Sequence, residues 1–152
     1  MPTLERAIEI AAAAHAGQLD KAGQPYILHP LRVMLRVAGD HERMAAVLHD
    51  VVEDTPVTLE RLAHEGFPAA VIAAVQALTK NPGESRLAAA ARAAANPIAR
   101  TVKLADNAEN MDLSRIAHPT EKDFARLKEY EQVRALLLAS NESNVVDQQW
   151  RK

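Results

Sequence analysis

Apolar residues recur at helical spacing along most of the chain. The first segment places Leu4, Ile8 and Ala11 on one side of a helix, and Thr3 before them is a suitable N-cap. Residues 44–52 repeat the pattern, with apolar side chains three and four positions apart. Glycine, proline and asparagine–proline pairs separate such segments. Together they predict about seven or eight helices, at approximately 4–16, 30–39, 40–53, 58–65, 68–79, 84–95, 97–113 and 120–139.

The composition indicates an all-α fold in a single domain. Of the 152 residues, 48% are hydrophobic but only 3% are aromatic, so small aliphatic side chains must build the core. Such side chains favour closely packed helices, whereas strands prefer β-branched and aromatic residues. We therefore expect a compact helical bundle over residues 1–139, followed by a polar, frayed tail over residues 140–152.

Charge and residue usage exclude several classes of protein. The formal net charge of −2 argues against a nucleic-acid-binding protein with a basic surface. Because the chain has no cysteine, it has no disulfide, thiolate metal site or thiol nucleophile. No apolar run approaches the roughly 20 residues that span a bilayer, and the first residues do not resemble a signal peptide. We expect a cytoplasmic protein with neither a membrane nor a nucleic acid as its partner.

One turn of the chain concentrates titratable side chains. Glu53 and Asp54 lie three and four residues after Asp50, on one helical face, and His49 is adjacent. Three carboxylates this close repel one another unless a cation compensates them. A solvated acidic helix end is one interpretation, and a metal site is the other. The adjacent imidazole and the apolar stripe beneath it favour the metal site.

Two residues elsewhere could complete such a site. His29 precedes Pro30 at the start of the second predicted helix, where it is either a ligand or a helix-flanking residue. Asp106 lies in a polar stripe of the helix over residues 97–113, which is either an exposed face or part of the site. We interpret His15 as a hydrogen-bonded structural histidine. The remaining histidines are interpreted as surface residues: His41, His64 and His118.

Two imidazoles and two carboxylates suit a borderline divalent ion such as manganese, iron, cobalt or zinc. Four protein ligands leave positions on a six-coordinate ion for water and a phosphate oxygen. Such an ion lowers the pKa of its water and neutralises phosphoryl charge, while neighbouring carboxylates orient or deprotonate that water. The residues by themselves therefore predict a hydrolase, with phosphate esters as the substrate class.

Four blocks of the sequence resemble the HD-domain metal-dependent phosphohydrolases. The likeness is to the hydrolase domain of the RelA/SpoT alarmone enzymes and to their small single-domain relatives. The blocks are residues 15–30 (HAGQLDKAGQPYILHP), 48–55 (LHDVVEDT), 102–111 (VKLADNAENM) and 126–130 (RLKEY). A His-Asp pair alone carries no information, but several ordered blocks with the expected residues are specific. The resemblance implies an HD-domain helical bundle over most of the chain.

The resemblance also implies roles for individual residues. One metal ion, usually manganese in this family, would be held by His29, His49, Asp50 and Asp106. The attacking water would be positioned and activated by Glu53 and Asp54. The nucleotide pocket would be lined by Lys21, Asn110, Arg126 and Tyr130. The implied reaction removes pyrophosphate from the 3′ position of guanosine tetra- or pentaphosphate and leaves GDP or GTP. Because the chain has no room for synthetase or regulatory domains, we expect it to act alone.

Two departures from the family pattern fall on the substrate side. Asp20 stands where the family commonly has arginine, and residues 106–110 read DNAEN where the family usually reads Asp-Arg-Leu-His-Asn, which adds Glu109. Both changes are expected to place an acid near the nucleotide. They leave open an HD phosphohydrolase for another nucleotide, such as a nucleoside monophosphate or another 3′-substituted nucleotide. A nucleotide-sensing domain without turnover is a third possibility, against which the complete ligand set speaks.

Overall fold

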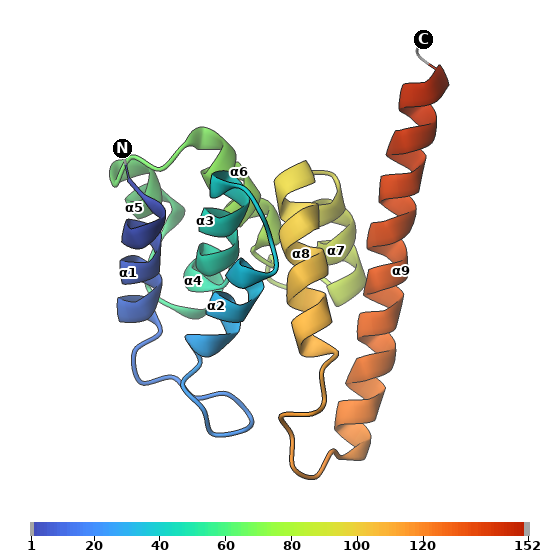
Figure 1. Ribbon diagram of the computed structural model, residues 1–152, viewed down its shortest axis with the longest axis horizontal. Coiled ribbons are helices and arrows are strands. Elements are labelled where there is room, and N and C mark those ends of the chain that lie inside the picture. The colour runs from blue at the N-terminus through green and yellow to red at the C-terminus, as the bar shows by residue number, and fades with distance from the viewer. Residues whose placement is uncertain (1, 151–152) are drawn as a thin grey trace.

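The computed structural model describes residues 2–150, with the backbone alone over 140–150 (Figure 1). The regular elements within these residues are all helices, which confirms the all-α fold. In chain order they are α1 (Leu4–Ala14), α2 (Leu28–Leu35), α3 (Asp40–Leu48), α4 (Val51–Asp54), α5 (Leu59–His64), α6 (Ala69–Leu78), α7 (Arg86–Ala94), α8 (Pro97–Asn110) and α9 (Glu121–Trp150).

The third predicted helix is two helices in the structure. α3 ends at Leu48 and α4 begins at Val51, so His49 and Asp50 lie in a turn between them. In a continuous helix the carbonyl of Ala46 would accept the Asp50 N–H. Here that carbonyl oxygen accepts from the imidazole Nδ1 of His49 at 2.5 Å, and such side-chain bonds compete with the helix. The break brings the helices described between residues 2 and 150 to nine, one more than predicted.

The larger hydrophobic core surrounds α3. Residues 45–48 are fully buried, because α1, α2, α6 and α8 all pack against this helix (Figure 1). Alanine at positions 45 and 46 lets these neighbours approach closely. Since α3 is enclosed up to its last residue, the turn that follows starts inside the protein. The His49 side chain is therefore buried.

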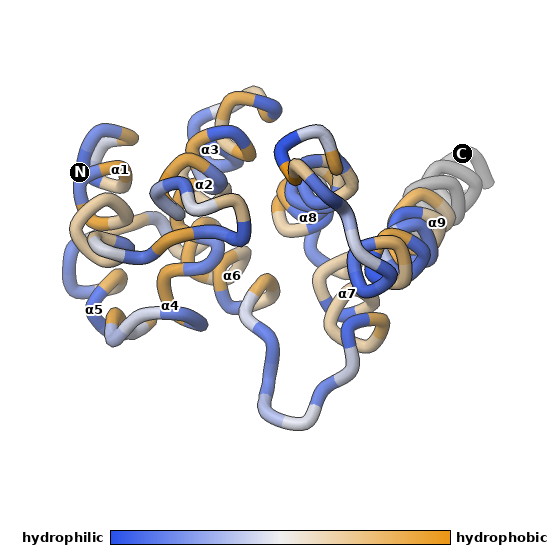
Figure 2. Tube along the Cα trace, turned by 90° about the horizontal axis from the view of Figure 1, so that it is seen from below, coloured by the Kyte–Doolittle hydropathy of each residue, from blue (hydrophilic) through white to orange (hydrophobic). Residues whose placement is uncertain are grey.

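A second, smaller core joins α7 to α9. Ala90 and Ala94 of α7 pack with Val133 and Leu137 of α9. Figure 2 shows α8 between this pair and the helices α1–α6, and α8 contacts both groups. The fold thus has two cores that meet along α8.

α9 extends beyond its predicted end near residue 139. It continues through Trp150 because residues 121–150 contain neither glycine nor proline to stop it. The sequence predicts a frayed tail over residues 140–152. The side chains of 140–150 and the whole of residues 151–152 lie outside the described part of the chain, so the fraying stays a prediction. Over the described part of the chain, no helix combines the length and apolar character needed to cross a membrane.

Candidate functional site

The turn between α3 and α4 directs a buried imidazole toward α8. His49 is only 3% exposed. Because a carbonyl oxygen can only accept, the contact from Nδ1 to Ala46 shows that Nδ1 carries a hydrogen. The other ring nitrogen, Nε2, then lies 3.4 Å from Oδ1 of Asp106. A local hydrogen bond thus fixes both the tautomer and the direction of this side chain.

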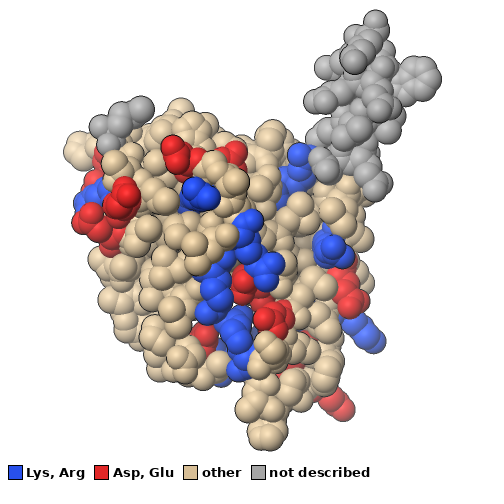
Figure 3. Space-filling model, viewed as in Figure 1, with Lys and Arg blue, Asp and Glu red and all other residues tan. Residues whose placement is uncertain are grey.

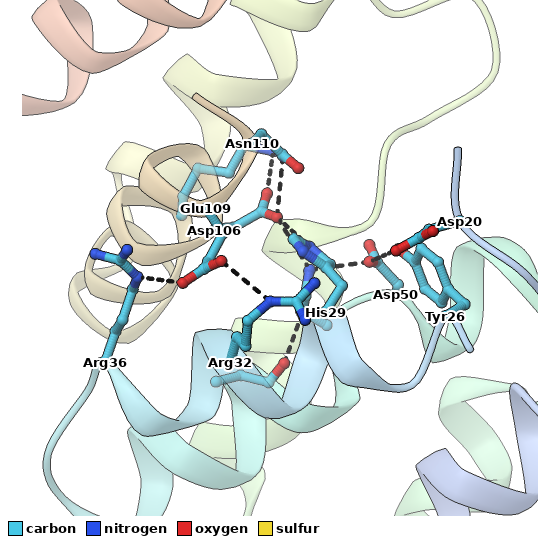
Figure 4. A network of polar contacts seen from close by, with 12 residues as sticks. Asp20, Tyr26, His29, Arg32, Arg36, Asp50, Asp106, Glu109 and Asn110 are labelled. Carbon is cyan, nitrogen blue, oxygen red and sulfur yellow. Dashed lines mark hydrogen bonds and ion pairs between the residues drawn. The ribbon is translucent and has the colours of Figure 1, made fainter. Parts of the chain in front are cut away.

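His29 and Asp106 complete a buried group with His49. His29 lies in the first turn of α2, and its Nε2 is 2.8 Å from Oδ1 of Asp106 on α8. One atom from each of the three side chains lies within 4.8 Å of the other two. Figure 4 shows His29 and Asp106 facing one another. Both are buried, so neither a helix-flanking histidine nor an exposed acidic face describes them.

Asp106 is held as a carboxylate. Its Oδ2 accepts from Lys103 Nζ at 3.2 Å, and its Oδ1 accepts from Asn110 Nδ2 at 3.2 Å. Burial opposes ionisation, but Lys103 and the two histidines hold the pKa of Asp106 well below its usual range. The group therefore offers a fixed negative charge in the interior.

The Nε2 atom of His49 is surrounded by acceptors. It lies 3.0 Å from Oδ2 of Asp50 as well as 3.4 Å from Asp106, and it makes no well-directed hydrogen bond within the described residues. Burial opposes a charged ring, but the two carboxylates raise the pKa of His49 well above its usual range. Because Nδ1 already carries a hydrogen, Nε2 meets these carboxylates favourably only through a second proton or a metal ion.

Asp50, Glu53 and Asp54 form a second, acidic group beside the first. One carboxylate oxygen from each lies within 4.8 Å of the others. Burial opposes ionisation of Asp50, but His49 lowers the pKa of its carboxyl. Partial burial raises the pKa of Asp54, and the neighbouring Asp50 and Glu53 raise it further. Asp50 connects the two groups, and the other two acids lie at the solvent side.

The residues of the first group, with Asp50, fit a divalent metal ion. Two imidazole nitrogens and two carboxylates are a donor set that borderline divalent ions accept. The orphaned Nε2 of His49, buried between two carboxylates, is the observation that indicates a cation at this point. The structure thus brings the four predicted ligands together, three in the buried group and Asp50 at its edge.

Both groups line one cavity of about 540 Å³. Its wall combines residues of α2, the α3–α4 turn, α4 and α8 with residues of α7 and α9. A pocket of this size with charged walls suits a small polar ligand. All four residues predicted to contact a nucleotide line it: Lys21, Asn110, Arg126 and Tyr130.

Several residues of the cavity wall escaped the sequence analysis, among them Arg86, Arg115 and Tyr26. Arg86 lies over the ring of Tyr130, with its guanidinium carbon 4.8 Å from the ring centre. Arg115 enters from the loop after α8. Tyr26 donates its hydroxyl hydrogen to the Asp50 carboxylate. The position of Tyr26 shortly before the first predicted histidine ligand is a usable signal, whereas no sequence pattern marks the two arginines.

Glu109 does not lie beside the nucleotide pocket, contrary to the prediction. Its position three residues after Asp106 puts it on the neighbouring face of α8, which packs against α2. There its buried carboxylate lies 3.2 Å from Arg32 Nε and 2.6 Å from Arg36 Nε (Figure 4). Figure 3 shows basic and acidic side chains intermixed across this side of the molecule. Glu109 therefore joins two helices and leaves the charge of the cavity unchanged.

Asp20 does line the cavity, but its carboxylate is engaged. Oδ1 accepts from the backbone N–H groups of Ala22 and Gln24, both at 2.9 Å. Oδ2 lies 3.7 Å from Nη1 of Arg115. The acid thus shapes its own loop and faces a cation on the opposite side.

The remaining histidines lie where the sequence predicted. His15 is buried, and its Nδ1 lies 2.8 Å from the Gln18 side-chain oxygen. Gln18 in turn donates to the carbonyl of Asp54 at 3.2 Å. The exposed histidines are His41, His64 and His118.

Comparison with known sequences identifies similar proteins. Residues 7–105 match the HD domain. A guanosine-3′,5′-bis(diphosphate) 3′-pyrophosphohydrolase of Haemophilus influenzae is 49% identical over 75 residues, 47% of this chain and 11% of the relative. A probable GTP pyrophosphokinase of Mycobacterium leprae is 36% identical over 139 residues, 83% of this chain and 17% of the relative. The chain thus spans less than a fifth of the length of these relatives.

A solved structure shares the fold. It is a metazoan ortholog of SpoT, described as hydrolysing ppGpp and acting in starvation responses. The superposition has a TM-score of 0.74 and covers 92% of this chain and 86% of the other. The two sequences are 24% identical, so the likeness establishes the arrangement of helices.

Proposed function

Because the chain belongs to the HD domain family, we propose that it is a metal-dependent phosphohydrolase that removes pyrophosphate from the 3′ position of guanosine tetra- or pentaphosphate. The products are GDP or GTP. The observation that carries this proposal is the buried group of His29, His49 and Asp106 on the wall of a cavity that arginine and lysine side chains also line. The Haemophilus relative is named for this reaction, which supports the same substrate.

The expected cofactor is one manganese ion with four ligands: His29, His49, Asp50 and Asp106. When bound, such an ion activates water as a Lewis acid and neutralises negative charge on a phosphoryl group. The chain prepares the ligands through contacts behind them. The Ala46 carbonyl fixes the His49 tautomer, and Lys103 and Asn110 hold the Asp106 carboxylate. Such outer contacts typically change metal affinity or activity by about 10- to 100-fold.

Glu53 and Asp54 are the groups that orient and deprotonate the attacking water. Both line the cavity, and the raised pKa of Asp54 makes it a stronger base once ionised. The water oxygen bonds to the phosphorus attached to the ribose 3′ oxygen, and the bond between that phosphorus and the 3′ oxygen breaks. One water proton passes to the carboxylate, and the carboxyl group formed in this way returns a proton to the 3′ oxygen, which leaves as a hydroxyl group.

Other residues of the cavity wall supply the groups that a polyphosphate nucleotide needs. Lys21 and Arg126 offer cations for phosphate oxygens. Tyr130, with Arg86 on its face, offers a ring edge and a guanidinium at one end. Asn110 donates its amide hydrogen to Asp106 and retains its carbonyl oxygen for the ligand.

The acid at position 20 favours a second candidate substrate. Asp20 lines the cavity and is only partly balanced by Arg115 at 3.7 Å. A less charged nucleotide, such as a nucleoside monophosphate or another 3′-substituted nucleotide, meets less repulsion there. The chemistry at the metal ligands would be the same.

A hydrolysis assay with manganese tests the proposal. The panel offers guanosine tetraphosphate, ATP, GMP, AMP and a 3′-phosphorylated nucleotide to the wild type and to two variants. We expect release of GDP and pyrophosphate, lost with a chelator and in Asp50→Ala. Glu53→Gln should bind manganese with wild-type affinity by calorimetry and turn over slowly. Turnover of another nucleotide alone would transfer the proposal to that substrate, and a metal-loaded wild type that hydrolyses nothing would refute the enzyme.

A further inference from the structure

Arg92 of α7 does not line the cavity, but its guanidinium group makes hydrogen bonds to both ends of the connection between α6 and α7. Nη1 donates to the carbonyl oxygens of Gln76 at 3.2 Å and Ala77 at 3.3 Å, and Nη2 donates to that of Thr79 at 2.6 Å. These carbonyls belong to the last turn and cap of α6. A cation there also meets the negative end of the helix dipole. Arg92 thus fixes the point where the chain leaves α6.

The same guanidinium fixes the far end of this connection. Nε and Nη2 donate to the two carboxylate oxygens of Glu84, at 3.0 and 2.9 Å. Glu84 Oε1 also accepts the backbone N–H of Asn81 at 3.0 Å. The hydrogen bond from Arg92, helped by that N–H, lowers the pKa of Glu84 to about 2. Figure 2 shows the connection as a loop that projects from the bundle, so few other elements support it.

Between the two clamped ends lies a contact with the acidic group. The backbone N–H of Lys80 donates to Oε1 of Glu53 at 2.9 Å. Glu53 belongs to α4, a helix of four residues, and its side chain is exposed. A backbone donor restrains such a side chain only if the backbone is itself held in place. The Lys80 N–H follows directly after the Thr79 carbonyl that Arg92 binds.

We propose that Arg92 is a positioning residue for the hydrolysis: it holds the α6–α7 loop so that the Lys80 N–H engages Glu53 Oε1 and leaves the second oxygen for the water. The effect on turnover rests on the proposed function. The restraint of the loop by Arg92 does not, because it is a property of the chain alone. A remote residue on an alanine-rich helix thereby acts on the acid that lies 39 positions earlier in the sequence.

The restraint is tested first without substrate or metal. In Arg92→Met we expect the Lys80 amide to exchange its hydrogen about tenfold faster than in the wild type, measured by NMR. Arg6→Met is the matched control, because Arg6 binds both oxygens of Glu65 at 3.1 and 2.8 Å in another part of the fold. It should leave Lys80 exchange unchanged. Equal exchange of Lys80 in wild type and Arg92→Met would overturn the proposal, whatever the protein hydrolyses.

Kinetics then separate positioning from general loosening. Arg92→Met should lower kcat for guanosine tetraphosphate by about 10- to 100-fold, the scale of a slightly misplaced group, with KM and manganese affinity within about twofold. In a Glu53→Gln background the same change should cost less than about twofold, because the group it positions is already disabled. If the losses in kcat from Arg92→Met and Glu53→Gln were fully additive, Arg92 would not act through Glu53, and the proposal would be refuted.

A milder variant keeps the test valid if Arg92→Met does not fold. Glu84→Gln retains the contacts of Arg92 to α6 and weakens only the far clamp. It should raise Lys80 exchange and lower kcat in the same direction by a smaller factor. A Glu84→Gln protein with wild-type exchange and wild-type kcat would overturn the proposal. If the wild type hydrolyses no nucleotide, the proposed function fails, while the exchange measurements still decide whether Arg92 restrains the loop.

Discussion

Replacing Glu109 by glutamine tests whether this acid joins two helices or repels the nucleotide. The side chain of glutamine has nearly the same shape but no charge. In the structure the carboxylate is 9% exposed and serves Arg32 through Oε2 and Arg36 through Oε1. A glutamine presents one oxygen and one N–H₂ group, so one of the two guanidinium groups would face a donor.

The loss of stability in Glu109→Gln follows from these two contacts. A hydrogen bond to a charged group contributes about 1.5–3 kcal/mol net, which applies to the less exposed Arg32. The side chain of Arg36 is 46% exposed, so its bond contributes at the surface scale of about 0–1 kcal/mol. Because the amide oxygen can serve only one of the two guanidinium groups, we expect the free energy of unfolding to fall by about 1–3 kcal/mol. For a domain of this length that lowers Tm by roughly 2–12 °C.

Thermal unfolding followed by circular dichroism measures the stability of the variant. Manganese-dependent hydrolysis of guanosine tetraphosphate measures its KM and kcat. Glu109→Gln should unfold earlier but keep KM and kcat within about twofold at a temperature where it is folded. Glu131→Gln, an exposed change on α9, is the control and should shift stability by less than about 0.5 kcal/mol. An unchanged Tm together with a lower KM would show that Glu109 acts on the nucleotide, and the reasoning from packing would be wrong.

Three further predictions concern contacts at and near the cavity. Tyr26→Phe removes the hydroxyl that donates to Asp50 and should weaken manganese binding about tenfold by calorimetry; an unchanged affinity contradicts this role. Asp20→Asn keeps the shape of the loop but removes a negative charge from the cavity wall. The removed repulsion is about 1 kcal/mol, so KM for guanosine tetraphosphate should fall severalfold. An equal or higher KM argues against repulsion. Because the folded pKa of Glu84 is about 2, its ionised form stabilises the fold above its unfolded pKa of about 4.5, and this stabilisation is lost as the pH falls toward 2. The stability difference between wild type and Glu84→Gln should therefore be present at pH 7 and vanish near pH 2, and a constant difference contradicts it.

Local features of this chain could be read from its sequence. Thr3 accepts the Arg6 N–H at the start of α1, and Asn96 accepts the Ala99 N–H at the start of α8, because capping depends on neighbouring residues alone. The three-residue interval from Asp50 to Glu53 likewise keeps two carboxylates together, although Asp50 lies in the turn before α4 and Glu53 in α4 itself. The candidate ligands could be named because their spacing and order match a known pattern.

Features that depend on distant partners could not be read in this way. The contact at the α3–α4 break, from the His49 ring to the Ala46 carbonyl, is local, but the helices that pack around α3 and bury this turn come from distant parts of the sequence. Glu109 looks like an acid beside the cavity until the position of α2 supplies Arg32 and Arg36. Contacts between residues far apart in sequence carry no local pattern.

The position of α8 between the two cores divides the cavity residues into two sets that can evolve separately. The proposed metal ligands come from α2, the α3–α4 turn and α8, whereas Arg86, Arg126 and Tyr130 come from α7 and α9. None of these last three side chains belongs to the core around α3, so substitutions at them disturb little of the packing there. A lineage built on this scaffold can therefore change which molecule it accepts while the proposed metal ligands descend unaltered.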